Sequence, residues 1–177
     1  MCEASQSQSV RNYTQCLDMR DFVVETELFP KSVLEAYSSW NLERPLSDID
    51  RSQMTEARGG TQGDYREGMA KKINNVVDCL SRFPQSKRAV ITISNNAFAS
   101  HQEDAAAKCL RELHLYFDDN DALSATVFFR AQAATIFPKN IHFIGSVMTE
   151  IAKQLPTHPS LGTVFYHATI LVSERHQ

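Results

Sequence analysis

The feature that most constrains the fold is a pair of alternating hydrophobic segments joined by an acidic turn. Every second residue is apolar, first at Leu113, Leu115 and Phe117 and then at Leu123, Ala125, Val127 and Phe129. Period-two alternation is typical of a strand with one buried face. The run Asp118-Asp119-Asn120-Asp121 between the two segments has the composition of a turn. Residues 109–130 are therefore predicted to form a β-hairpin.

Helical and strand patterns lie on either side of this hairpin. Helical spacing of apolar residues predicts one helix over 69–80, ending before Pro84, and a longer core helix over 141–155. Alternation predicts a strand over 87–94 that is covered on both sides, and a last strand over 163–172. The order helix, strand, hairpin, helix, strand predicts an α+β fold with a mixed, largely antiparallel sheet and a long core helix.

The remaining segments have weaker patterns. Residues 1–15 are rich in Ser and Gln and are predicted to be a weakly ordered polar segment. We assign 16–177 to a single domain, because 177 residues with 42% hydrophobic content can build one core but not two sizeable ones. Three glycines within 58–64 predict a loop that can approach a ligand closely. Residues 95–108 are predicted to be a polar connection.

Composition limits the classes of partner. A net charge of −3 is the opposite of a broad basic surface, so we expect a small anionic partner and no nucleic acid. The apolar runs are much shorter than the roughly 20 residues that cross a bilayer, so no membrane partner is expected. The four cysteines show no metal-binding spacing, and no signal peptide precedes them. We therefore expect a cytoplasmic protein with reduced thiols and no bound metal.

The residues with the clearest chemical potential surround Cys109. This thiol lies between a strand that begins with Ser86-Lys87-Arg88 and a strand that ends in Arg130. A thiolate is the reactive form of cysteine, and neighbouring arginines stabilise it. Cys109 is therefore a candidate nucleophile, although a small buried hydrophobe is the commoner state of a reduced cysteine.

Each cationic or polar neighbour also has a purely structural interpretation. Arg130 follows the apolar and aromatic run Val127-Phe128-Phe129 and needs either an anionic ligand or an intrachain salt bridge. Lys87 and Arg88 can mark a solvated strand entrance. Asn140 can cap the helix that begins after Pro138, and Arg66 can be a surface residue.

Two histidines and the acidic turn complete the set of candidates. His114 and His167 fall on predicted strands and titrate near neutral pH, but packed or surface roles are preferred for both. The acidic turn at 118–121 lacks the rest of a calcium loop. We interpret it as a solvated hairpin tip.

This layout resembles the central part of thymidylate synthase and its pyrimidine hydroxymethylase relatives, over about 63–176. The family's catalytic cysteine and strand-end arginine match Cys109 and Arg130. A serine followed by two arginines, which reach the substrate phosphate of the neighbouring subunit, matches Ser86-Lys87-Arg88. The family's proline-phenylalanine-asparagine run, whose asparagine reads the pyrimidine edge, matches Pro138-Lys139-Asn140.

The resemblance implies a homodimeric, nucleotide-binding transferase of biosynthesis. Cys109 would add to C6 of a pyrimidine-nucleotide-like anionic substrate, which makes C5 nucleophilic toward a one-carbon electrophile. Lys87, Arg88 and Arg130 would bind the anionic group, with Arg66 as a further contact and Asn140 orienting a polar edge. The family's one-carbon donor is methylene-tetrahydrofolate.

Several residues that the family uses for its reaction are replaced in this chain, and these replacements change the reaction that we expect. Ala131 and Ala133 stand for a serine and for an aspartate that contacts the folate pterin, and Ile170 and Val172 for residues that hold the sugar hydroxyl. We therefore predict a divergent transferase that does not carry out ordinary dTMP synthesis. Two alternatives stay open: a non-catalytic binding or assembly protein on the same dimeric fold, and a thiol-dependent acyl transferase or hydrolase.

Overall fold

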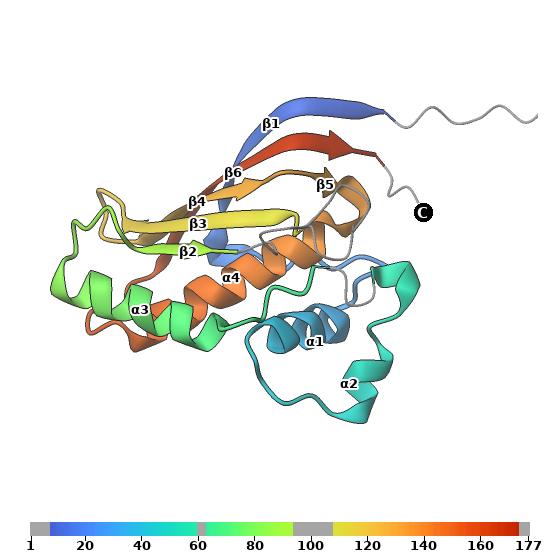
Figure 1. Cartoon of the computed structure of the whole chain (residues 1–177), viewed down its shortest axis with the longest axis horizontal. Helices are drawn as coiled ribbons and strands as arrows, with labels where there is room; N and C mark the ends of the chain where they lie inside the picture. The colour runs from blue at the N-terminus through green and yellow to red at the C-terminus, as the bar shows by residue number, and fades with distance from the viewer. Residues whose placement is uncertain (1–7, 60–62, 94–107, 174–177) are drawn as a thin grey trace, which may run out of the picture.

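The protein has a mixed six-stranded sheet covered on one face by helices (Figure 1). The computed structural model describes residues 8–59, 63–93 and 108–173. The strand order is β1 (Ser9–Asp18), β6 (Leu161–Val172), β4 (Leu123–Phe129), β3 (Leu110–Phe117) and β2 (Val90–Thr92), and the short β5 (Gln132–Ala133) also pairs with β6. Only the β4–β6 and β5–β6 pairs are parallel. The predicted α+β class and largely antiparallel sheet are confirmed.

The described helices all lie on the same side of the sheet (Figure 1). They are α1 (Lys31–Asn41), α2 (Asp48–Ser52), α3 (Met69–Arg82) and α4 (Phe137–Gln154), with 3₁₀ turns η1 (Met19–Asp21), η2 (Glu56–Arg58) and η3 (Ala134–Ile136). The two helices predicted from apolar spacing are α3 and α4, and both are confirmed. α4 lies against the sheet, and its apolar stripe packs in the core with inward residues such as Val127 and Tyr166.

The hairpin predicted over 109–130 is formed by β3 and β4. Leu113 pairs with Val127 and Leu115 with Ala125, so the alternating apolar residues of both strands face the helices. At the tip, the Asp118 carboxylate accepts from the amides of Asn120 and Ala122. The hydrogen bond from the Asn120 amide, followed by that from the Ser124 hydroxyl, lowers the pKa of Asp118. The tip is a fixed turn that keeps its charge.

Two local predictions are wrong. Residues 9–15 are not weakly ordered, because they belong to β1, which pairs antiparallel with β6 from Ser9 opposite Val172 to Asp18 opposite Thr163. The strand predicted over 87–94 is shorter and is open on one side. Ile91 is buried against the helices, but Thr92 on the other face is exposed, because no helix of the described chain covers that face.

Parts of four predicted segments lie outside the described residues: 1–7 of the polar start, 60–62 of the glycine loop, 94 of the strand predicted over 87–94 and 95–107 of the polar connection. Across the described ranges, no helix combines the length and apolar character needed to span a bilayer.

Candidate functional site

Cys109 and Arg130 meet at one end of the β3–β4 hairpin. Cys109 directly precedes β3 and Arg130 directly follows β4, and the Arg130 amide donates to the Cys109 carbonyl at 2.9 Å. The Arg130 Nε donates to the carbonyl of Lys108 at 3.3 Å. Cys109 is half-buried, whereas Arg130 is exposed. A thiol and two cationic residues therefore share one edge of the sheet.

Tyr65 interacts electrostatically with both Cys109 and Arg130. Its hydroxyl accepts from the amide of Leu110 at 3.4 Å, and its ring stacks on Phe143 with centroids 5.7 Å apart. Burial raises the pKa of Tyr65, and negative charge on Cys109 adds to that rise, while Arg130 opposes it. The hydroxyl thus stays protonated, within electrostatic reach of both the thiol and the guanidinium.

Helix α1 holds the segment that carries Tyr65. The Tyr65 amide donates to Asn41 Oδ1 at 2.6 Å, and Asn41 Nδ2 donates to the Tyr37 carbonyl at 3.1 Å. The Tyr37 hydroxyl donates to the Gly63 carbonyl at 2.7 Å. Burial raises the pKa of Tyr37 well above its usual value, so it too remains a neutral donor. Gly63 has φ 79°, the left-handed region that favours glycine.

A buried polar network lies behind these tyrosines. Asn140 Nδ2 donates to Gln132 Oε1 at 2.8 Å, and the Tyr166 hydroxyl donates to the same oxygen at 3.0 Å. The capping interpretation of Asn140 is wrong, because α4 already begins at Phe137 and the Asn140 side chain is buried within the helix. Its amide instead forms a hydrogen bond within the buried polar network.

Lys139, the neighbour of Asn140, is a buried cation in the same region. Its Nζ donates to the Arg58 carbonyl at 3.2 Å and lies 4.2 Å from the centroid of the Tyr37 ring. The side chain is only 2% exposed. Carbonyl and aromatic contacts of this kind stabilise an ammonium group away from water.

Lys87 and Arg88 lie far from Cys109 of their own chain. Both precede β2, in which Val90 pairs with His114, so Arg88 is level with Tyr116 at the opposite end of β3. Seven residues of strand separate that level from Cys109, a distance of roughly 20 Å. A single chain therefore does not bring the strand-entrance cations to the thiol.

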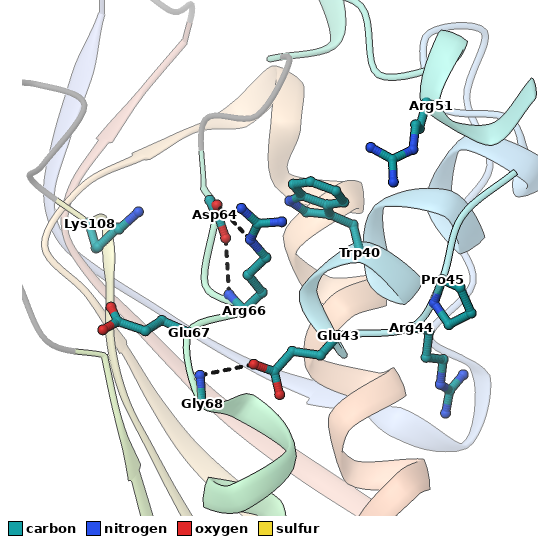
Figure 2. Close-up of a pocket in the computed structure, with 10 residues that line it drawn as sticks. All are labelled: Trp40, Glu43, Arg44, Pro45, Arg51, Asp64, Arg66, Glu67, Gly68 and Lys108. Carbon is teal, nitrogen blue, oxygen red and sulfur yellow. Dashed lines mark hydrogen bonds and ion pairs between the residues drawn. The ribbon is translucent and has the colours of Figure 1, made fainter. Parts of the chain in front are cut away.

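Arg66 lies in a surface cleft next to the Cys109 segment (Figure 2). The cleft has a volume of about 730 Å³ and is lined by Trp40, Glu43, Arg44, Pro45, Arg51, Asp64, Arg66, Glu67, Gly68 and Lys108. Arg66 pairs with Asp64 at 3.1 Å and stacks over the Trp40 ring at 3.9 Å. Lys108, the residue before Cys109, lines the cleft, whereas Cys109 itself does not line it and packs against the hydrophobic core.

No protein-family model matches this chain, and a search of curated proteins finds no match.

Sequence reasoning missed several residues that form this region: Trp40, Tyr37, Tyr65, Gln132, Lys139 and Tyr166. One signal was available, because a lysine beside an asparagine in the first turn of an otherwise apolar helix is unusual. The tyrosines gave no such signal, since their roles depend on contacts between distant segments.

The two candidate histidines lie away from the thiol. His114 and His167 are on β3 and β6, on the sheet face opposite the helices, and the ring of His167 lies 5.4 Å from that of Phe128. Within the described ranges, no three His, Cys, Asp or Glu side chains form a group able to hold a metal ion. The described cysteines, Cys16, Cys79 and Cys109, are thiols.

Proposed function

We propose that this protein is a divergent, thymidylate-synthase-like transferase that uses Cys109 as a nucleophile on a pyrimidine-nucleotide-like or other anionic substrate. The observation that supports this most is the meeting of the half-buried Cys109 with Arg130 at the end of the hairpin, beside the protonated hydroxyl of Tyr65. A guanidinium near a thiol favours the thiolate and attracts anionic substrates.

The proposed reaction begins with a bond between the Cys109 sulfur and C6 of the pyrimidine ring. The electron pair of the C5–C6 double bond moves into the ring carbonyl, so that C5 becomes a nucleophile. C5 then bonds to a one-carbon electrophile, loses its proton, and the thiolate leaves as the double bond re-forms. The donor is an electrophilic one-carbon carrier. Ala133, in place of the family's folate-contacting aspartate, argues against the ordinary folate-dependent synthesis of dTMP.

The proposal includes a homodimer. Lys87 and Arg88 lie roughly 20 Å from Cys109 of their own chain along the antiparallel pair β2–β3. In the family that the chain resembles, the corresponding cations serve the neighbouring subunit. The sheet face without helices, which carries the exposed Phe128 and Phe165, is the surface that supports this pairing.

Hydrogen exchange at C5 tests the proposal without knowledge of the one-carbon donor. Addition of the thiolate to C6 makes the C5 proton exchangeable, so dUMP, dCMP or CMP in D₂O should lose its C5–H signal in proton NMR. We expect exchange with at least one nucleotide, its loss in Cys109→Ser, and its retention in Cys79→Ser, which removes another half-buried thiol. Equal exchange in the Cys109→Ser variant, or none with any nucleotide, would overturn the covalent mechanism.

One observation favours a second candidate, a nucleotide-binding protein without turnover. The Asn140 amide, which reads the pyrimidine in the family, is buried and hydrogen-bonded to Gln132 here. Calorimetric titration with the same nucleotides separates the candidates: binding that persists in Cys109→Ser without C5 exchange in the wild type favours the binding protein.

A further inference from the structure

The cleft beside the Cys109 segment contains a buried hydrogen-bond donor that no described group accepts. The indole Nε1 of Trp40 is buried, and within the described chain it has no acceptor. A buried N–H without an acceptor is destabilising, and native proteins seldom keep one without a reason. Figure 2 shows the nitrogen edge of the indole turned toward the guanidinium of Arg66. This guanidinium stacks over the indole ring and has only donor groups, so it cannot accept from the indole N–H.

Cations surround this indole. The Arg66 guanidinium lies 3.9 Å from the ring centroid and that of Arg51 lies 5.7 Å from it. Lys108 lies on the opposite wall of the cleft (Figure 2). Within the described residues, Arg51 has no carboxylate partner, whereas Arg66 shares Asp64 at 3.1 Å. In the described part of the chain, the Trp40 N–H therefore has no acceptor and Arg51 has no carboxylate partner.

Three acidic residues line the cleft, Glu43, Asp64 and Glu67, and the first two are engaged in hydrogen bonds or an ion pair. Glu43 accepts from the amides of Gly68 and Ala70 at 3.1 and 3.0 Å, so its charge caps the N-terminus of α3. Asp64 accepts from the Arg66 side chain and from the Arg66 amide. These carboxylates serve local structure and leave the indole N–H without an acceptor.

We propose that the cleft binds the carboxylate or phosphate group of a small ligand. One oxyanion beside Arg66 accepts from its guanidinium and from the indole N–H of Trp40, with Arg51 and Lys108 adding positive charge. Charge-assisted bonds to a guanidinium fork are the strongest contacts available to such a group. The volume of about 730 Å³ is in the range of small-molecule sites.

The cleft lies next to the segment that carries Cys109, so we assign its ligand as a second reactant. Lys108 precedes Cys109, and Arg66 follows Tyr65, whose hydroxyl lies at the start of β3. A ligand held by its acid group in the cleft can extend toward Cys109. The role of reactant rests on the proposed function, whereas binding of the acid group does not.

Fluorescence reports this site directly, because Trp40 is the single tryptophan of the chain. The full-length protein is titrated with inorganic phosphate and with benzoate, and benzamide serves as the uncharged analogue of benzoate. We expect saturable fluorescence changes with one or both anions and none with benzamide. The anion that binds with the higher affinity identifies the preferred acid group. The absence of a saturable change with both anions overturns the proposal.

Variants locate the binding. Arg66→Gln and Arg51→Gln should each weaken the anion at least tenfold by calorimetry, whereas Arg82→Gln, which removes an exposed arginine paired with Asp78 on α3, should leave it unchanged. Trp40→Phe keeps an aromatic ring but removes the N–H, and should also weaken binding. Equal affinities in Arg66→Gln, Arg82→Gln and wild type overturn the assignment of the cleft.

Cys109→Ser separates this proposal from the proposed function. The fluorescence response should be intact in this variant even though C5 exchange is lost. If C5 exchange fails in the wild type while the cleft binds anions, the transferase mechanism fails and the anion site stands. If exchange occurs but neither anion binds, the cleft proposal fails and the mechanism stands.

Discussion

His142 on α4 is a buried titratable group whose environment favours the neutral ring. Its Nδ1 lies 2.7 Å from the hydroxyl of Ser38 on α1, and its ring meets that of Phe22 edge to face at 5.5 Å. Burial, with a smaller contribution from the charge of Lys31, lowers the pKa of His142 from 6.5 to about 4. The side chain is only 5% exposed. It therefore couples the packing of α1 on α4 to pH.

Acidification should destabilise the protein through this residue. Between about pH 6.5 and pH 4 the unfolded chain binds a proton at His142 that the folded chain does not, so the free energy of unfolding falls as the pH falls. The loss is at most roughly 3 kcal/mol, because each unit of pKa difference corresponds to about 1.4 kcal/mol. Urea unfolding from pH 7.5 to 4.5 measures this slope.

A pair of variants isolates the contribution of His142 to that slope. His142→Gln should reduce the pH dependence, while His158→Asn, at an exposed turn after α4, should keep it. An unchanged slope in His142→Gln would contradict the assignment. Asn suits position 158 because the backbone there has φ 44°, in the left-handed region.

Sequence predicted the thiol–arginine pair but not the residues behind it. Cys109 and Arg130 end adjacent strands of a hairpin, so alternation and a turn were enough to bring them together. Tyr65 reaches β3 only because Asn41 on α1 holds its amide and the preceding loop bends at Gly63. Such contacts between distant segments leave no periodic pattern in the sequence.

At the scale of elements, Gly145 allows the chain before α1 to pack closely on α4. A Cβ at this position would lie 2.3, 2.4 and 2.6 Å from three ring atoms of Phe22. These atoms are at the base of the ring, so the whole side chain would have to move and lose its contact with His142. Gly145→Ala should therefore destabilise the protein by about 1–3 kcal/mol, which lowers Tm by about 2–4 °C per kcal/mol for a chain of this size.

Thermal unfolding with a matched control tests this packing. Lys153→Ala, on the exposed side of the same helix, should change stability by no more than about 0.5 kcal/mol. In a Phe22→Ala background, Gly145→Ala should cost much less, because the clashing ring is gone. If the effects of the two changes on stability are additive, the contact between position 145 and the Phe22 ring is not the cause of the destabilisation.

Elements with one buried face were predictable, and the edge strand β1 was not. β3, β4 and β6 alternate in sequence because the helices cover one of their faces. Most of β1 is exposed on both faces, so its residues carry no apolar period, and backbone hydrogen bonds to β6 hold it in place. The strand over 87–94 was misjudged for the related reason that β-branched residues favour strands whether or not their outer face is covered.

At the scale of the whole molecule, the sheet has one face without a described covering element. Phe128 and Phe165 are 38% and 41% exposed there, and the β4–β6 pairing sets them opposite His167 and Thr126. Neighbouring exposed aromatic side chains on a protein surface mark interaction sites. In an isologous dimer each copy presents the same surface to the other, so the contact would bury this patch on both copies.

Charge on this face should therefore separate a dimer into monomers. Light scattering after size exclusion is expected to give twice the chain mass of 20.0 kDa for the wild type, and a mass near that of one chain for Phe128→Asp or Phe165→Asp. Phe83→Asp tests for a general effect of an exposed phenylalanine, since Phe83 is 66% exposed but follows α3 on the other side of the sheet. The Phe83→Asp variant should remain dimeric.

The rate of C5 exchange should decrease in the monomeric variants, because Lys87 and Arg88 would no longer reach the thiol of a neighbouring chain. A fully active monomer would rule out a shared site.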